Sequence, residues 1–213
     1  MLIKRLYRNA LSDERGSFSV EAVLMFPMLV WAFMGMYSFF EGLRESNINL
    51  KATYAIADVL SRETEEITDV YLENMNTIYE WLARTDDDTM MRVSVVIWDE
   101  TSEQHTLYWS RGVNGREDLP AELVKTNITP HVPIMADQAS AIVVESWVDH
   151  NPIMLPVNDF PLFKMLGLGW EPTEIYKIVV VSPRFVDQLK FEGMGDGTGS
   201  THDDDVEEDA DAI

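Results

Sequence analysis

The chain has 213 residues and a formal net charge of -21, with 37 acidic residues against 16 basic ones. This length suits one domain of ordinary size together with one additional segment. The acidic excess repels nucleic acid and anionic lipid head groups, so we expect no nucleic-acid partner. No cysteine is present, which excludes disulfides, thiol catalysis and cysteine-ligated zinc.

An uncharged apolar run begins close to the N-terminus. Residues 22–40, AVLMFPMLVWAFMGMYSFF, contain 19 consecutive positions without a charge. At about 1.5 Å of rise per residue, a helix of this length spans roughly 28 Å, close to the hydrocarbon thickness of a bilayer. The alternatives are a buried core helix or a cleaved secretory signal, but a signal has a shorter apolar core and a small-x-small site directly after it. We therefore expect a retained transmembrane helix over residues 17–41.

Basic residues near the two ends of this run predict its orientation. Those before it are Lys4, Arg5, Arg8 and Arg15, and those after it, Arg44 and Lys51, are accompanied by Glu41 and Glu45. Because basic flanks stay inside, residues 1–16 are expected to form a cytoplasmic basic leader. Residues 42–192 are then expected to form an extracytoplasmic domain.

Glu21 places a carboxylate at the start of the apolar run. A carboxylate entering hydrocarbon is costly unless it is protonated or paired. Cleavage after Gly16 would create an α-amine on Ser17, four residues before Glu21 and on the same helical face. That amine would pair with Glu21 of its own chain or of a packed neighbour. The alternatives are an interfacial Glu21 whose carboxylate reaches water, and a Gly16 that only starts the helix.

The basic leader, Gly16, Glu21 five residues later and the apolar helix resemble the processing signature of type IV pilin-like proteins. Within that class, residues 13–64 resemble the TadE/TadF-like minor pseudopilins of the tight-adherence (Tad/Flp) pilus system. The resemblance covers about a quarter of the chain. Two departures from the major Flp pilins are Ala22, where those carry tyrosine, and a much greater length, which points to a minor subunit.

The resemblance implies a location, a set of partners and roles for three residues. A prepilin peptidase would cleave between Gly16 and Ser17, and Glu21 would guide assembly. The protein would lie in the bacterial inner membrane with its C-terminal domain in the periplasm, or become incorporated in a pilus. Its partners would be other pilin-like subunits and the Tad secretion machinery.

Beyond the membrane segment the periodicity predicts an α+β domain. A helical stripe through Leu43, Leu50, Tyr54, Ala57 and Leu60 extends the first helix to a charged break at residues 61–66. Apolar residues at helical spacing predict a second helix, with Thr64 as its cap and its end before Asp86. They are Ile67, Val70, Tyr71, Ile78, Trp81 and Leu82, together with Asn74.

Four strands are expected after the second helix. Residues 91–98 and 104–110 alternate in the manner of a hairpin, and residues 140–149 and 174–182 are rich in β-branched side chains. Asp118, followed by Pro120 and AELVK, predicts a short capped helix between them. This order of elements predicts an antiparallel sheet with a long helix against it. The resemblance implies that this arrangement is a pilin-like body.

Residues 151–172 contain four prolines and many large apolar side chains. The prolines exclude a regular strand, so this segment is expected either to fold onto the sheet as core or to expose a patch for another subunit. The candidate contact residues are Met154, Leu155, Phe163, Met165 and Trp170. Residues 193–213, a glycine-rich spacer followed by an acidic run, are expected to be disordered.

Catalytic and metal-binding motifs are not apparent. The four histidines are scattered without paired spacing, no G-x-S-x-G is present, and the acidic tail lacks the ligand order of an EF-hand. We therefore expect no catalytic residue, metal or cofactor. The resemblance implies a minor pseudopilin that acts in assembly of a Tad-type pilus. The alternatives are a permanently anchored scaffold or adhesion domain, or an anchored hydrolase with paired carboxylates.

Overall fold

A computed structural model describes residues 17–85, 89–151 and 173–193. The helices are α2 (Ser17–Arg62), α3 (Asp69–Ala83) and α4 (Val124–Asn127), with a 3-10 turn, η2, at Ala121–Leu123. The strands are β1 (Thr89–Asp99), β2 (Gln104–Val113), β3 (Ser140–His150) and β4 (Thr173–Val181). The predicted α+β class and the four strands are confirmed within this part of the chain, with ends that differ by up to three residues.

The four strands form one antiparallel sheet in the order β2-β1-β3-β4. The register of β1 and β2 shifts between Val95 and Val96, which pair with Trp109 and Leu107. Tyr108 is therefore an extra residue in a β-bulge on the edge strand β2. The predicted hairpin of residues 91–98 and 104–110 is thus present, but β1 also pairs with β3, which follows it by about forty residues.

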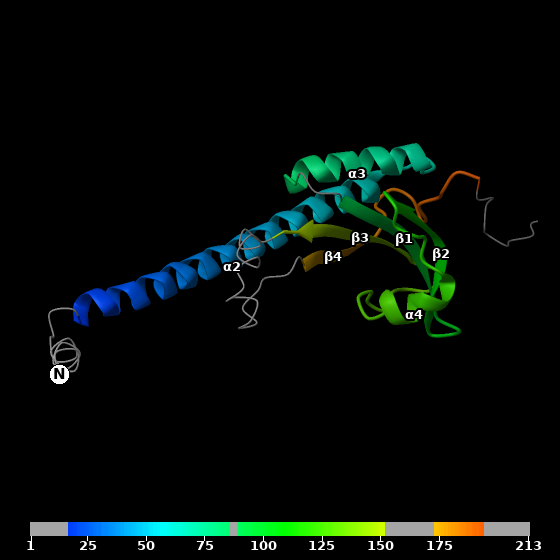
Figure 1. Cartoon of the computed structure of the whole chain (residues 1–213). Coiled ribbons are helices and arrows are strands. Elements are labelled where there is room, and N and C mark those ends of the chain that lie inside the picture. Colours follow the sequence, from blue (N-terminus) through cyan, green and yellow to red (C-terminus); the bar gives the residue numbers. More distant parts are fainter. Residues whose placement is uncertain (1–16, 86–88, 152–172, 194–213) are drawn as a thin grey trace, which may run out of the picture.

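Two helices cover one face of the sheet (Figure 1). α2 packs on β3 and β4, and α3 packs antiparallel to α2 and lies over β1 and β2. The core between these layers contains the alternate residues of each strand that point toward the helices, such as Met91, Val93 and Val95 on β1. Burial of such side chains contributes about 25 cal/mol per Å² of apolar surface and holds the C-terminal half of α2 on the sheet.

A smaller core lies on the opposite face, under η2 and α4. Its members come from β1, β3 and the segment between β2 and β3: Val96, Leu119, Val124, Ile128, Val132, Ala141 and Val143. β1 and β3 are therefore buried on both faces, which explains why their side chains are largely apolar on both sides of the strand.

Two predicted helix caps are wrong. The N-cap of α3 is Thr68, whose hydroxyl accepts the Tyr71 N–H, and not Thr64. The helix starts later because Ile67 forms an isolated parallel bridge with Phe191. Asp118 does not cap a helix; its carboxylate accepts the Gly112 N–H at 2.8 Å and pairs with Arg111 at 3.1 Å. These contacts join segments that periodicity alone does not connect.

Candidate membrane anchor and assembly site

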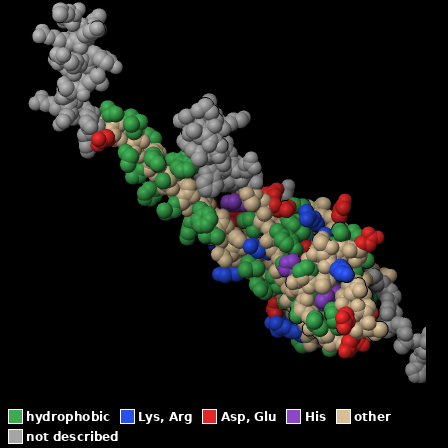
Figure 2. Space-filling model, turned by 90° about the horizontal axis from the view of Figure 1, so that it is seen from below, with side chains coloured by type: hydrophobic (Ala, Val, Ile, Leu, Met, Phe, Trp, Pro, Cys, Tyr) green, Lys and Arg blue, Asp and Glu red, His purple; other side chains and the backbone are tan. Residues whose placement is uncertain are grey.

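The N-terminal half of α2 is apolar and exposed. Every described side chain from residue 19 to residue 30 is exposed, and the apolar ones include Leu24, Phe26 and Leu29. The apolar side chains on this rod-like extension are visible beyond the folded body (Figure 2). Of the helices described, α2 is long and apolar enough to cross a membrane. Because such a surface is unfavourable in water, this half of α2 is a candidate membrane anchor.

The described helix begins at Ser17 and is continuous through Pro27 to Arg62. Pro27 therefore does not interrupt it, although proline removes one backbone donor. Glu21 lies one turn after Ser17 with its side chain exposed. Gly16, the other predicted processing residue, lies outside the described residues, and α2 thus places two of the three predicted residues on adjacent turns.

A polar contact joins the sheet to α2 where the apolar half of the helix ends. The imidazole Nδ1 of His150, at the end of β3, contacts the Glu45 carboxylate. The same imidazole lies over Gly42, where an added Cβ would stand 3.4 Å from Nε2. The sequence did not predict a contact between His150 and Glu45, because a separation of 105 residues gives no local signal.

Further along, α2 and β3 meet through buried polar side chains. The Thr53 hydroxyl is 2.7 Å from the Ser146 hydroxyl and also donates to the Asn49 carbonyl oxygen at 2.8 Å. Tyr79 on α3 is buried, and its burial raises the pKa of its phenol. Because buried polar groups are costly to leave unpaired, the Thr53–Ser146 hydrogen bond favours one alignment of α2 on β3 over others.

The predicted subunit-contact patch lies outside the described residues, as do the leader and the acidic tail. It comprises Met154, Leu155, Phe163, Met165 and Trp170. Another exposed apolar surface is present on α3, where Val70, Ile78 and Trp81 are 64%, 43% and 79% exposed. The face that α3 buries instead carries Leu72, Met75 and Tyr79.

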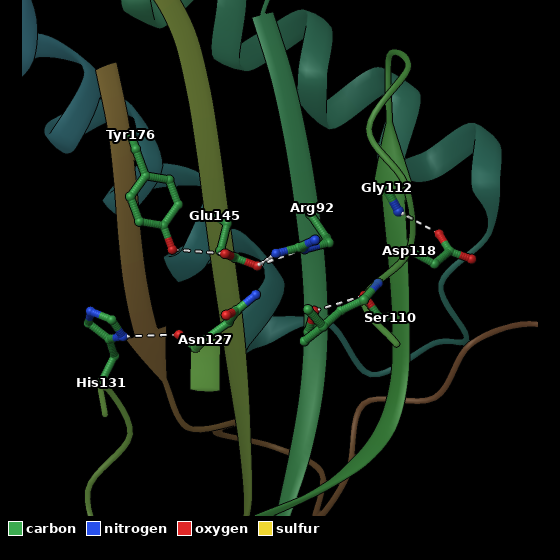
Figure 3. Close-up of polar contacts among 10 residues, drawn as sticks. Arg92, Ser110, Gly112, Asp118, Asn127, His131, Glu145 and Tyr176 are labelled. Carbon is green, nitrogen blue, oxygen red and sulfur yellow. Dashed lines mark hydrogen bonds and ion pairs between the residues drawn. The ribbon is translucent and has the colours of Figure 1, made fainter. Parts of the chain in front are cut away.

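The opposite face of the sheet carries a buried charged network (Figure 3). Both Nε and Nη2 of Arg92 donate to Oε2 of Glu145, at 2.7 and 2.6 Å. The Tyr176 hydroxyl donates to Oε1 of the same carboxylate at 2.8 Å. Burial and the adjacent Glu145 carboxylate raise the pKa of Tyr176, so its phenol remains a hydrogen-bond donor.

Aromatic rings flank this network. The guanidinium carbon of Arg116 lies 3.8 Å from the ring centroid of Trp147, and that of Arg92 lies 5.2 Å from it. Trp147 in turn packs against Tyr176, with 5.2 Å between ring centroids. Each carboxylate oxygen of Glu145 thus accepts a hydrogen bond, Oε2 from Arg92 and Oε1 from Tyr176. This is the arrangement of a structural ion pair.

Glu145 is paired with Arg92 and not with a second carboxylate. A group of three or more potential metal ligands is likewise not found among the residues with described positions. His105 packs against Trp98, with 4.7 Å between ring centroids, and fills a core position on β2.

An open hollow of about 1110 Å³ lies between the α2–α3 turn, the start of β3 and residues 182–190. Its lining includes Glu65, Glu66, Asp137 and Asp187. It is a surface depression formed where residues 182–190 cross the end of the sheet.

Comparison of the chain with protein-family models, with curated proteins and with solved structures finds no match.

Proposed function

We propose that this protein is a membrane-anchored minor pseudopilin that acts in the assembly of a Tad-type adhesive pilus. The observation that supports it best is the division of α2 into two halves. One half is exposed and apolar, and the other packs on a four-stranded antiparallel sheet. A continuous helix of this kind places the sheet domain directly outside the membrane and leaves the apolar half for lipid or for neighbouring helices.

In this proposal the basic leader keeps the N-terminus in the cytoplasm, and the sheet domain faces the periplasm. Cleavage after Gly16 releases the α-amine of Ser17. The Glu21 carboxylate then pairs with the amine of a neighbouring subunit, because two opposite charges at the edge of the hydrocarbon attract strongly. Glu21 thereby sets the depth at which neighbouring helices pack.

The contact between His150 and Glu45 supports the same role. It joins the sheet to α2 just beyond the apolar half of the helix, so the domain and the anchor meet at a defined point. A subunit that transmits helix packing to contacts between domains requires such a connection.

The first experiment is the intact mass and N-terminal sequence of the protein from membranes of its native cell. An N-terminus at Ser17 is expected, and Glu21→Gln is then expected to abolish pilus assembly while the protein remains in the membrane. Glu41→Gln, just beyond the apolar run, is the matched control and is expected to leave assembly intact. An uncut N-terminus at Met1 would contradict the proposal and favour a permanently anchored scaffold or adhesion domain.

A further inference from the structure

We propose that residues 152–172, the apolar segment between β3 and β4, bind to one face of the membrane-spanning part of α2 in the same chain. This docking face is defined by Trp31, Gly35, Ser38 and Gly42. Residues 152–172 lie outside the described residues, and their position is inferred from α2 and from the described residues on either side of them. The inference goes beyond the proposed function: it rests on the membrane insertion of α2, but not on cleavage after Gly16 or on pilus assembly.

The docking face is covered, although the stretch of α2 around it is exposed. Ser38 is 2% exposed, whereas the two residues before it, Met36 and Tyr37, are 71% and 55% exposed. Gly35 and Trp31, one and two turns before Ser38 on the same face, are half-buried. Protein atoms therefore cover this face at a level of the helix where the other side chains are exposed.

The described part of the sheet reaches only one end of the docking face. The His150 imidazole lies over Gly42, and Thr173 at the start of β4 pairs with His150. Figure 1 shows the arrowhead of β3 beside the middle of α2. Trp31 lies eleven residues before Gly42, or about 16 Å along the helix at about 1.5 Å of rise per residue. The cover of Trp31 therefore comes from chain outside the described residues.

Position and charge select one of the four segments outside the described residues. Residues 1–16 form the basic leader at the opposite end of the apolar half of α2, and residues 86–88 are three aspartates. Residues 194–213 are strongly acidic and follow Glu192, whose N–H donates to the Ile67 carbonyl oxygen beyond the C-terminal end of α2. Residues 152–172 are apolar, and the chain leaves and re-enters the described residues beside Gly42.

The length and composition of residues 152–172 suit this face. A segment of 21 residues that leaves and returns at one point reaches roughly 33 Å when extended, about twice the distance to Trp31. Eleven of its residues are Val, Ile, Leu, Met, Phe or Trp. Of its three charged residues, Glu171 adjoins β4, and Asp159 and Lys164 have opposite signs. We expect these two to pair, because charged groups at membrane depth are costly without a partner.

Small side chains and unpaired polar groups explain why the segment binds α2 and not lipid alone. Gly35, Ser38 and Gly42 have little side-chain bulk, so a second backbone can approach the helix closely. The Ser38 hydroxyl and the Trp31 indole N–H are buried and have no hydrogen-bond partner among the described residues. Four prolines prevent regular backbone pairing in residues 152–172, and backbone groups at membrane depth need protein partners. Ser38 and Trp31 supply such partners.

This contact assigns the two sides of α2 to different partners. The apolar residues predicted as a subunit-contact patch bind α2 of their own chain instead. Lipid and neighbouring helices then meet the opposite face of α2, whose side chains are exposed: Leu29, Phe33, Met36 and Phe40.

Disulfide formation within the chain tests the contact, because no native cysteine is present. Full-length variants in native membranes combine Leu155→Cys with Ser38→Cys, or with Met36→Cys on the exposed face at nearly the same depth. With copper phenanthroline as oxidant, the Ser38 pair is expected to form its disulfide at least about tenfold faster, because proximity raises the effective thiol concentration. Mass spectrometry is expected to show both cysteines in one chain.

A second pair, Ser38→Cys with Gly169→Cys, approaches the docking face from the β4 side of the segment. Failure of both Ser38 pairs would overturn the proposal, and so would equal rates for the Ser38 and Met36 pairs. A Ser38 disulfide that forms only between two differently tagged copies would also overturn it, because a second chain would then cover the face.

Trypsin cleavage after Lys164, the basic residue of the segment, gives a second measurement on spheroplasts. Ser38→Trp places a bulky side chain on the docking face and is expected to raise the cleavage rate about tenfold, since the protease cuts the opened state in proportion to its population. Met36→Trp, on the opposite face, is the matched control and is expected to leave the rate unchanged. Equal rates in the two variants would contradict the contact.

The N-terminal sequence of the protein separates this inference from the proposed function. A protein that starts at Ser17 but forms neither Ser38 disulfide contradicts only the contact with residues 152–172. A protein that starts at Met1 and forms the disulfide within one chain contradicts only the pseudopilin proposal. Extraction of the natural protein by alkaline carbonate would show that α2 is not inserted, and both would then be wrong.

Discussion

Arg92 and Glu145 lie directly opposite each other on β1 and β3 and form a buried ion pair, with 2.6 Å between Nη2 and Oε2. Their side chains are 9% and 2% exposed. The Tyr176 hydroxyl donates to the same carboxylate from β4, so one hydrogen-bonded network connects three strands. Its members are separated by 31 and 53 residues in the sequence and meet only through strand pairing.

Removal of one partner of this pair is expected to destabilise the protein strongly. Glu145→Ala leaves the Arg92 guanidinium buried without a counter-charge, at a cost of about 3–5 kcal/mol. Urea unfolding of the detergent-solubilised full chain measures this loss. The double variant Arg92→Met with Glu145→Met is expected to be much closer to the natural protein, because it removes both charges. A double variant as unstable as Glu145→Ala would contradict this explanation.

Stability is expected to fall at alkaline pH because Tyr71, Tyr79 and Tyr176 have raised pKa values and hold their protons in the folded state. Burial, assisted by the Glu63 carboxylate, raises the pKa of Tyr71 from 10.0 to about 12, and burial with Glu145 raises that of Tyr176. The unfolded chain loses these protons near the ordinary pKa, so the free energy of unfolding decreases as pH rises above about 10.

Urea unfolding at pH 8 and at pH 11 measures this dependence. Tyr71→Phe and Tyr176→Phe are each expected to lower stability at pH 8 and to reduce the further loss at pH 11, since phenylalanine has no proton to lose. Tyr54→Phe, which alters an exposed tyrosine, is the control and is expected to retain the full dependence. An unchanged pH dependence in both the Tyr71 and the Tyr176 variant would contradict the assignment.

Gly112 is expected to tolerate no side chain. A Cβ on Gly112 would stand 2.0 Å from the Arg116 carbonyl oxygen, which is backbone and has no rotamer by which to move away. Gly112→Ala is therefore expected to displace the loop that holds Asp118, at a cost of about 1–3 kcal/mol.

Gly115→Ala in the same loop provides a comparison. Gly115 has a φ of 85° but no atom within 4 Å of an added Cβ, so its substitution adds only backbone strain of about 1–2 kcal/mol. Thermal unfolding of both variants compares the cost of the steric clash at Gly112 with the cost of backbone strain at Gly115. A nearly unchanged Gly112→Ala protein would show that the loop relaxes freely.

The contact between Glu45 and His150 is expected to couple the sheet to the membrane-proximal part of α2. Because both side chains are partly buried, a double-mutant cycle with Glu45→Gln and His150→Phe should give a coupling free energy of about 1 kcal/mol. Limited proteolysis near residue 151 reports local opening, and it is expected to increase in each single variant. The Arg62–Asp58 pair, which is more exposed, should give a smaller coupling.

Local patterns predicted the elements of this fold. The uncharged run of residues 22–40 indicated a long helix, and alternation over residues 91–98 and 104–110 indicated the hairpin. These predictions succeed because helix and strand formation depend on side chains that are near in sequence. The boundaries were less accurate, since Thr68 caps α3 only because Ile67 bridges to Phe191.

The same periodicity could not show which face of α3 is buried. Val70, Ile78 and Trp81 recur at helical spacing as regularly as Leu72, Met75 and Tyr79, and each set suits a core. The structure buries the second set and exposes the first. The choice depends on how α3 lies against α2 and the sheet, which no local pattern records.

The sequence by itself determined that this chain has one long apolar helix, an α+β domain and a carboxylate near the start of the apolar run. Those properties follow from hydrophobicity, charge and spacing along a continuous stretch of chain. Only the tertiary structure decided that Arg92 meets Glu145 and that Trp81 faces outward, because both depend on contacts between segments far apart in the sequence. Packing over the whole domain selects such contacts, and a short segment of sequence does not contain the information that determines this packing.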